Sequence, residues 1–480
     1  MTEVERSVSK HYDDSSGPWL HAWFDPLAAV HTVTGCVRLG DLFADGDCKM
    51  LICDLDKKLK VYKGTTMLHE YALLDSPVAA CIFYTDTFAP RTPSIAVAAG
   101  SHLFIYRNMR PYKKWTCPLT EPTSTETEIW SQLKRGEMDA ETAYSNLMQA
   151  RESGIFLTAR SLDLILLEEP SRRAEYVDEV KGVQFAQQTL ITCLETLKRD
   201  SDDHDGVTLC VVGTESSHVY ILPPDCSGST SLCKVAVGAV PVLMCPSGRF
   251  DVEWRVMVAC RDGRLYSIKE GDVRGTAVLT GNVIDLGAQA IAMAREDKLT
   301  WVATTDRTIS CYTTRGKRTA SISLTEDVTD MCVISLKKSK VTHALLVGLS
   351  NGEVRMYQGS TILHSFSVEK PVVALRFGFY GREDNSLVIV HGKGSAITIK
   401  MLRRTVLVDL DAMVAQMRGP PMEQDIPLSV PKKTKLFVEQ TQREREQAMD
   451  IHRAFQKDLC KLRLSTARSY VKTLTDGHMV

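Results

Sequence analysis

The stretch THALLVGLSNGEVRMY, residues 342–357, decides the fold of this chain. Its first half, Thr342 to Leu349, is an apolar run of strand length, and Val354 to Tyr357 begins a second, alternating strand. Between them, Ser350-Asn351-Gly352 supplies residues that tolerate the positive φ of a tight hairpin turn. The stretch therefore predicts two antiparallel strands joined by a short turn.

The same phrase recurs along the chain and forms the repeating unit of a larger architecture. Its second strand occurs seven times, at residues 59–62, 103–106, 219–222, 265–268, 309–312, 354–357 and 397–400. Five of the six intervals between these copies are 43 to 46 residues long, and one is stretched to 116. A period of about 40–45 residues is typical of one four-stranded blade of a β-propeller.

Other segments supply the remaining strands of each predicted blade. Pro77-Val78, Pro241-Val242, Asp327-Val328 and Pro371-Val372 open a strand upstream of a turn. One blade alone exposes two apolar faces, whereas a closed ring of seven covers them. The predicted fold class is therefore all-β: a seven-bladed β-propeller.

Helical segments interrupt and follow this propeller. The stretched interval contains helix formers at 126–150, 157–167 and 172–187, which predict an insertion between blades two and three. Residues 189–197 also resemble a helix, but the third blade requires its first strand there. A linker with Gly419-Pro420-Pro421 ends the propeller, and residues 439–473 predict a C-terminal amphipathic helix.

The expected domains follow from these boundaries. They are a flexible N-terminus at 1–18, blades one and two at 19–117, the helical insertion at 118–187, blades three to seven at 188–410, a linker at 411–434 and an amphipathic or coiled-coil helix at 435–476. The apolar stripe of this last helix predicts a partner face made of Ile451, Phe455, Leu459, Leu462 and Tyr470. The stripe suits either another chain or the chain's own propeller.

Composition limits the classes of function that the protein can have. The 58 basic and 59 acidic side chains nearly cancel, so no overall field would attract nucleic acid or an anionic membrane. No stretch has the roughly 18 unbroken apolar residues that span a bilayer. The 14 cysteines are scattered singly in apolar segments, which predicts buried, reduced thiols. We expect a cytoplasmic protein that contacts membranes only peripherally.

The sequence contains no motif for catalysis. H-E-x-x-H, G-x-S-x-G, a Walker loop and paired zinc ligands are all absent, so we expect no catalytic residue, no metal site and no cofactor. Gly392-Lys393-Gly394-Ser395 reads as a hairpin turn, because neither the upstream glycine nor the helix of a phosphate loop is present. Asp45-Gly46-Asp47 lacks the closing glutamate of an EF-hand. These features favour a non-enzymatic scaffold.

Several phrases resemble the Bardet-Biedl syndrome 1 family, subunits of the ciliary BBSome. In the propeller they are residues 91–93, 108–112, 213–215, 348–355 and 380–385. Beyond it they are Gln442 to Glu446, His452 to Gln456 and Leu462 to Leu464, so the resemblance covers nearly the whole chain. Family members continue into an ear-like β-sandwich, whereas this sequence stops at Val480.

The resemblance implies a place in a coat-like complex that carries signalling membrane proteins into and out of cilia. The expected partners are other BBSome subunits, a GTP-bound Arf-like small GTPase and ciliary membrane-protein cargo. The expected locations are the cytoplasm and the cilium, at its membrane, basal body and axoneme. In this family the first and last blades bind the GTPase, which brings the complex to the membrane.

Basic residues on those two blades are the candidate partner-binding residues. They are Lys57, Lys58 and Lys60 in blade one, and Arg382, Lys393, Arg403 and Arg404 in blade seven. Two other functions stay open on the residues alone. One is a propeller enzyme with a metal or quinone site in its central channel, which needs converging His, Asp or Glu side chains. The other is an adaptor that binds lipid directly through basic loops.

Overall fold

The computed structural model of the protein describes residues 17–403 and 434–477, apart from 89–90, 120–121, 154–156, 181, 184, 186–187, 227–230, 272–275, 282, 297, 338–340 and 393–395. It divides into two units, Met1–Met417 and Arg418–Val480, which we describe separately. Within these residues no helix combines the length and the apolar character needed to cross a bilayer.

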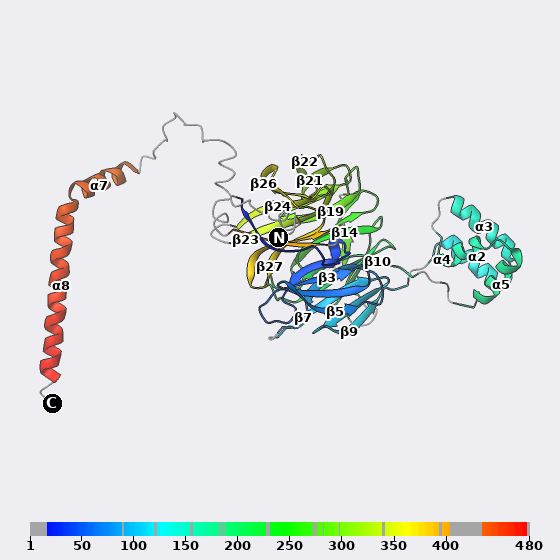
Figure 1. Ribbon diagram of the computed structural model, residues 1–480, viewed down its shortest axis with the longest axis horizontal. Helices are drawn as coiled ribbons and strands as arrows, with labels where there is room; N and C mark the ends of the chain where they lie inside the picture. The colour runs from blue at the N-terminus through cyan, green and yellow to red at the C-terminus, as the bar shows by residue number, and fades with distance from the viewer. Residues whose placement is uncertain are drawn as a thin grey trace, which may run out of the picture. The chain divides into compact units, whose positions relative to one another are not determined.

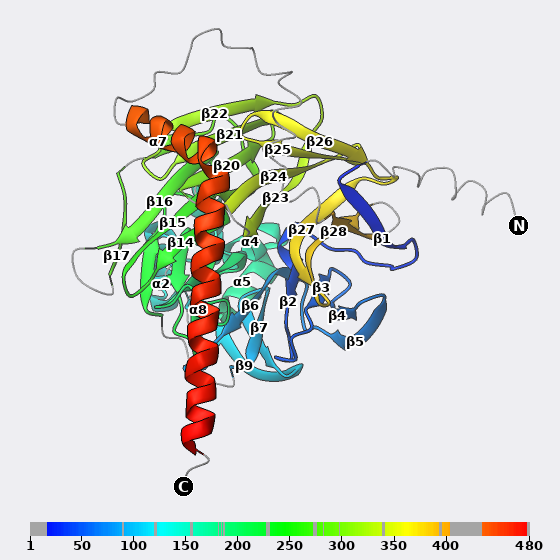
Figure 2. The same ribbon diagram turned by 90° about the vertical axis from the view of Figure 1, so that its left-hand side faces the viewer.

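The first unit is a ring of four-stranded antiparallel blades (Figures 1 and 2). Blade one contains β2 (Val37–Gly40), β3 (Lys49–Asp54), β4 (Lys58–Lys63) and β5 (Thr66–Ala72), and blade two contains β6 (Pro77–Tyr84), β7 (Pro93–Ala99), β8 (His102–Arg107) and β9 (Arg110–Thr116). Blade three contains β10 (Ile191–Lys198), β11 (Thr208–Thr214), β12 (His218–Ile221) and β13 (Cys233–Ala236), and blade four contains β14 (Pro241–Arg249), β15 (Glu253–Cys260), β16 (Arg264–Glu270) and β17 (Ala277–Leu279), with β18 (Ile284–Asp285) beside β16.

The remaining blades complete the ring. Blade five contains β19 (Ala290–Glu296), β20 (Leu299–Thr304), β21 (Thr308–Thr313) and β22 (Arg318–Ser323), and blade six contains β23 (Val328–Lys337), β24 (Val341–Leu349), β25 (Glu353–Gln358) and β26 (Thr361–Ser367). Blade seven contains β27 (Val372–Tyr380), β28 (Glu383–His391), β29 (Ile397–Leu402) and β1 (Trp19–Asp25). A 3-10 turn, η1 (Thr34–Cys36), precedes β2. The first strand of each blade contacts the first strands of both neighbours, and β2 closes the circle against β27. The predicted seven-bladed fold is confirmed.

The closing strand of blade seven comes from the start of the chain. β1 pairs antiparallel with β29, from Trp19 opposite Leu402 to Asp25 opposite Ile397. The sequence assigned residues 19–117 to blades one and two, whereas residues 19–25 belong to blade seven. The repeat marks only the third strand of each blade, so it does not reveal which end of the chain supplies the last fourth strand.

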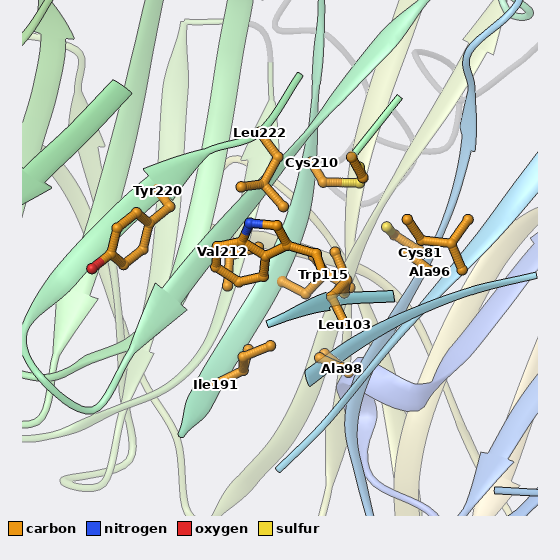
Figure 3. Close-up of a cluster of buried hydrophobic side chains, with 14 of the residues drawn as sticks. Cys81, Ala96, Ala98, Leu103, Trp115, Ile191, Cys210, Val212, Tyr220 and Leu222 are labelled. Atoms are coloured by element: carbon orange, nitrogen blue, oxygen red, sulfur yellow. The ribbon is translucent and has the colours of Figure 1, made fainter. Parts of the chain in front are cut away.

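Apolar clusters between adjacent blades form the core. Figure 3 shows the cluster between blades two and three, where Trp115 and Tyr220 lie among Leu103, Cys210 and Val212. The two aromatic ring centroids are 5.9 Å apart, and both side chains are almost fully buried. β10 supplies Ile191 and Leu194 to this cluster, which confirms that residues 189–197 contain a strand.

The helical insertion has a core of its own. It contains α2 (Ser124–Arg135), α3 (Ala140–Glu152), α4 (Ala159–Leu166) and α5 (Pro170–Val180). The sequence predicted one helical stretch at 126–150, but Gly136, at φ 74°, ends α2 in a left-handed cap. Trp130 packs against Leu147 and Leu164, and its indole N–H donates to Ser161 at 3.0 Å. These buried contacts make the four helices a compact subdomain.

The second unit contains α7 (Thr434–Glu446) and α8 (Ala448–Gly477). The sequence predicted one helix at 435–476, and the structure divides it at Gln447. The predicted linker at 411–434 lies outside the described residues except for Thr434, and the N-terminus is described only from Gly17. No described residue of α8 is buried, so its apolar side chains all remain accessible within this unit.

Candidate functional site

The predicted basic residues lie on two opposite faces of the ring. We letter the strands of each blade A to D from the inside outward. Because successive strands are antiparallel, A–B and C–D turns open on one face, the AB face, and B–C turns on the other, the BC face. Lys57 lies in the β3–β4 turn on the BC face. Arg382 lies in the β27–β28 turn, and Arg403 follows β29, both on the AB face.

Two of the blade-one lysines are exposed but paired. Lys57 adopts the left-handed φ of 60°, and its Nζ lies 3.6 Å from Asp75. Lys58 Nζ lies 2.6 Å from Glu70, whose hydrogen bond raises the pKa of this lysine. Both lysine side chains are about half exposed, at 51% and 50%. Surface pairs of this kind are weak, so a partner can compete for either lysine.

Lys60 is not presented at the surface, contrary to the expectation from sequence. Its side chain is 8% exposed and its Nζ lies 2.7 Å from Asp54, which is fully buried. The same ammonium donates to the carbonyl of Ala29 at 2.7 Å. Lys58 and Lys60 are two residues apart and therefore point to the same side of β4, so strand alternation does not indicate that Lys60 is buried. Its role is to neutralise a buried carboxylate.

His31, Asp54 and Asp56 form a small cluster beside Lys60. Their ligand-type atoms all lie within 4.8 Å of one another, and His31 Nδ1 is 3.3 Å from Asp56. Asp54 also accepts the backbone N–H of His31 at 3.2 Å. Because the Lys60 ammonium already neutralises Asp54, the cluster needs no additional cation. Sequence spacing did not reveal it, since His31 and Asp54 are joined only by the fold.

Arg382 is held on a rigid part of the AB face. Gly381, at φ 64°, forms paired backbone hydrogen bonds with Cys48 of blade one, at 2.8 and 2.7 Å. The Tyr380 hydroxyl donates to the carbonyl of Gly64 at 2.6 Å. The exposed Arg382 side chain forms no hydrogen bond or ion pair with any residue that the structure describes. Its guanidinium is therefore available to a partner at the seam between blades one and seven.

Arg403 lies on the same face of blade seven. Its backbone N–H donates to Pro18 at 2.9 Å, which fixes the end of β29 beside β1. The side chain is half-buried. Lys393 and Arg404 lie outside the described residues. Of the predicted residues, the structure therefore places Arg382 and Arg403 on the AB face and Lys57 and Lys58 on the BC face.

A loop next to Arg382 completes this part of the seam. Lys49, whose side chain is 1% exposed, donates from Nζ to Asp45 at 2.7 and 2.9 Å and to the carbonyl of Asp47 at 2.7 Å. The hydrogen bond from Lys49 lowers the pKa of Asp45 to about 2. In this Asp-rich loop the Lys49 ammonium thus neutralises the Asp45 carboxylate. Sequence reasoning missed Lys49, because a lysine beginning an apolar strand resembles a solvated end.

The central channel contains two ion pairs that link non-adjacent parts of the sequence. Strands β2, β6, β10, β14, β19, β23 and β27 all line a hollow of about 460 Å³. Arg38 reaches Glu195 at 2.6 Å, and Arg376 reaches Asp330 at 2.8 Å. Burial raises the pKa of Asp330, and the Arg376 charge opposes that shift. Both carboxylates among the described lining residues are paired with arginine, which disfavours a channel enzyme.

The predicted stripe on the C-terminal helix lies on α8. Exposed fractions are 50% for Ile451, 61% for Phe455, 63% for Leu462 and 66% for Tyr470, while Leu459 is half-buried. Large apolar side chains this exposed along one side of a helix are typical of a helix that packs on a partner.

Comparisons with known proteins agree with this architecture. The family model described as ciliary BBSome complex subunit 1 matches residues 19–269. The chain is 36% identical over 469 residues to BBSome complex member BBS1 of Mus musculus and of Homo sapiens, which covers 96% of this chain and 77% of each relative.

Two solved structures are similar to the propeller. Both are crystal structures of BBS1N in complex with ARL6DN, one soaked with mercury and one with lead. Each has a TM-score of 0.65 and covers 81% of this chain and 98% of the solved chain, at 34% and 35% identity. Sequence and fold thus agree over most of the molecule, and the chain belongs to the family of BBSome complex subunit 1.

Proposed function

We propose that this protein is a non-enzymatic scaffold subunit of the BBSome that binds a GTP-bound Arf-like small GTPase. The observation that carries this proposal is the similarity, at 34–35% identity, to a propeller crystallised in complex with ARL6DN. Binding would recruit the complex to the ciliary membrane and support the transport of membrane-protein cargo. The protein would then work in the cytoplasm and in the cilium, at its membrane, basal body and axoneme.

We assign GTPase binding to the AB face at the seam of blades one and seven. Arg382 supports this choice, because its exposed guanidinium has no partner among the described residues and its turn is bonded to Cys48 of blade one. Arg403 lies on the same face, and Lys393 and Arg404 stay predictions. Lys57 and Lys58 on the opposite face are already paired with acids, so we expect them to contribute less.

The domain limits predicted from sequence complete the proposal, with residues 19–25 reassigned to blade seven. The propeller would bind the GTPase, and the α8 stripe of Ile451, Phe455, Leu459, Leu462 and Tyr470 would bind other BBSome subunits. The insertion at 118–187 has a separate core, which supports a separate docking role.

The test is binding of the purified full chain to ARL6 loaded with a GTP analogue or with GDP. The variants are Arg382→Glu and Arg403→Glu on the AB face and a Lys57→Glu/Lys58→Glu pair on the BC face. Lys317→Glu is a matched control, because Lys317 is exposed in the C–D turn of blade five, on the AB face but away from the seam. Arg307→Glu controls for Lys57, since both residues lie in B–C turns at similar φ and pair with an aspartate.

We expect binding of the GTP form only, with a roughly tenfold weaker Kd for Arg382→Glu and little change for either control. Equal binding of both nucleotide forms, or none to a folded chain, contradicts the recruitment function. Loss of GTPase binding only in the Lys57→Glu/Lys58→Glu variant contradicts the assignment of binding to the AB face. Anionic liposomes without GTPase form a separate arm, in which strong binding would favour a direct lipid adaptor.

A further inference from the structure

The second half of α8 carries another apolar stripe, on the side away from Phe455. We call Leu464, Ala467, Val471 and Leu474 the distal stripe; they follow one another at spacings of three and four residues. Val471 comes 16 residues after Phe455, which at about 100° per residue places it roughly 160° around the helix. Leu464, Val471 and Leu474 are 53%, 58% and 48% exposed. A single partner on the Phe455 side would leave Leu464 and Val471 in water, although Leu474 lies beside Tyr470 at a spacing of four residues.

An open hollow lies along part of the distal stripe. A hollow of about 540 Å³ is lined by Leu464, Ala467, Arg468, Val471, Lys472 and Thr475. These residues make two overlapping sets with the spacing i, i+3, i+4 and i+7, the four-residue holes that accept one side chain each in coiled-coil packing. Ala467 is one of the four residues of the first set, and its single methyl group leaves room for a large apolar side chain.

Cations border this hollow along one edge. Lys457, Lys461, Arg468 and Lys472 follow at spacings of four and seven residues, so they lie in one row beside the distal stripe. Between Ile451 and Thr475 the sequence has one acid, Asp458, and it pairs with Lys461 at 3.3 Å. A second copy of α8 would bring cations of both chains together at this edge. The charge pattern therefore favours an acidic occupant over self-association.

We propose that the distal stripe binds an amphipathic helix of another protein, with acidic residues flanking that helix's own apolar stripe. Its apolar side chains enter the two holes, and its acids pair with Arg468 and Lys472. α8 then packs against partners on two opposite sides and becomes an inner helix of a bundle. A membrane surface fits less well, because it accepts a broad apolar sector, whereas the distal stripe is narrow and bordered by charge.

The experiment measures binding of the purified full chain to two synthetic helical peptides of about four heptads, each with leucine at positions a and d. One peptide has glutamate at e and g and the other has lysine, so like charges keep each from pairing with itself. The variants are Ala467→Trp, which fills the first hole, and Arg468→Glu/Lys472→Glu, which reverses the edge. Phe455→Ala is the matched control on the other stripe. Circular dichroism verifies that each variant keeps its helix.

We expect the glutamate peptide to bind the unmodified chain at least tenfold more tightly than the lysine peptide. Ala467→Trp should weaken that binding at least tenfold, Phe455→Ala should leave it within twofold, and the charge reversal should invert the peptide preference. Equal binding of both peptides overturns the proposal, as does insensitivity to Ala467→Trp. Two other outcomes overturn the proposal by identifying another occupant. One is self-association of the chain that Ala467→Trp abolishes, and the other is binding to vesicles containing phosphatidylserine that competes with the glutamate peptide.

Discussion

The propeller and α8 use apolar side chains in opposite ways. Trp115 in the propeller is fully buried between blades two and three, whereas Phe455 on α8 is 61% exposed. Adjacent blades share their apolar clusters, so removal of one side chain affects two blades. The described residues of α8 contribute to no buried apolar cluster within their own unit. Similar residue types therefore stabilise the fold in the propeller, whereas on α8 they are exposed and available to bind a partner.

The largest effect should come from Trp115→Ala. This change removes the ring that packs against Tyr220 and leaves a cavity between two blades, so the free energy of unfolding should fall by about 4 kcal/mol. Denaturant unfolding followed by circular dichroism measures it. Trp115→Phe fills most of the site and should cost much less. A loss below about 1 kcal/mol for the alanine variant would mean that the blades are not stabilised by their shared cores.

Removal of the Lys60 ammonium should have the next largest effect. Lys60→Met leaves the Asp54 carboxylate buried without its ion-pair partner, which should cost about 3 kcal/mol. The same unfolding measurement applies, and Lys58→Met, at the exposed start of β4, is the control. Lys60→Met combined with Asp54→Leu should recover most of the loss. A partner-binding defect without any loss of stability would restore Lys60 to the surface site predicted from sequence.

A smaller, pH-dependent effect should come from His391 in blade seven. Its ring contacts Thr398 at 2.7 Å and the Lys370 carbonyl at 3.2 Å, and burial lowers its pKa below the usual 6.5. The unfolded chain therefore binds a proton at a higher pH than the folded one. The stability from neutral His391 is complete above about pH 6.5 and falls as the pH drops toward the folded pKa.

The free energy of unfolding, measured between pH 7.5 and 5, should show this loss. His391→Gln should make the free energy of unfolding depend less steeply on pH. His31, which is exposed beside Asp56, provides the control through His31→Gln. An unchanged slope in the His391 variant would assign the pH dependence to other groups.

The smallest effect on stability should come from Phe455→Ala. Because the ring is exposed, the free energy of unfolding of the isolated chain should change by less than about 0.5 kcal/mol. The thermal transition of the propeller measures this. A loss comparable to that of Trp115→Ala would show that α8 folds back on its own propeller, the alternative that the sequence left open.

The sequence revealed the repeat better than it revealed the site. The B–C turn places a left-handed residue at Lys57, Gly100, Ser217, Gly263, Arg307 and Gly352, so the blade period is encoded in local backbone chemistry. These turns depend only on neighbouring residues, so they can be recognised directly in the sequence. The strand order of blade seven depends on contact between Trp19 and Leu402, which no local pattern encodes.

The same limit applies to the charged residues. Finding basic residues in blades one and seven does not show that Lys58 is exposed and Lys60 buried. It also does not show which residues lie on the AB face and which on the BC face. Strand alternation does not separate Lys58 from Lys60 either, because residues two apart point to the same side of β4. Lys58 is exposed at the start of the strand, whereas Lys60 is buried in its interior. The ion pairs of Arg38 with Glu195 and of Arg376 with Asp330 join residues 157 and 46 positions apart in different blades, so they required the folded ring.

The origin of β1 also affects how the protein is made. Asp25 leaves the ribosome about 370 residues before its partner Ile397, a delay of roughly 20 to 70 s at ordinary rates of synthesis. Throughout this time β1 is a strand without a sheet, and the surface it later covers on β29 does not yet exist. Blades two to six can stack as they emerge, but the circle closes only after the final strand is translated. A premature stop before residue 397 would therefore leave both ends of an open blade array exposed to chaperones and proteases.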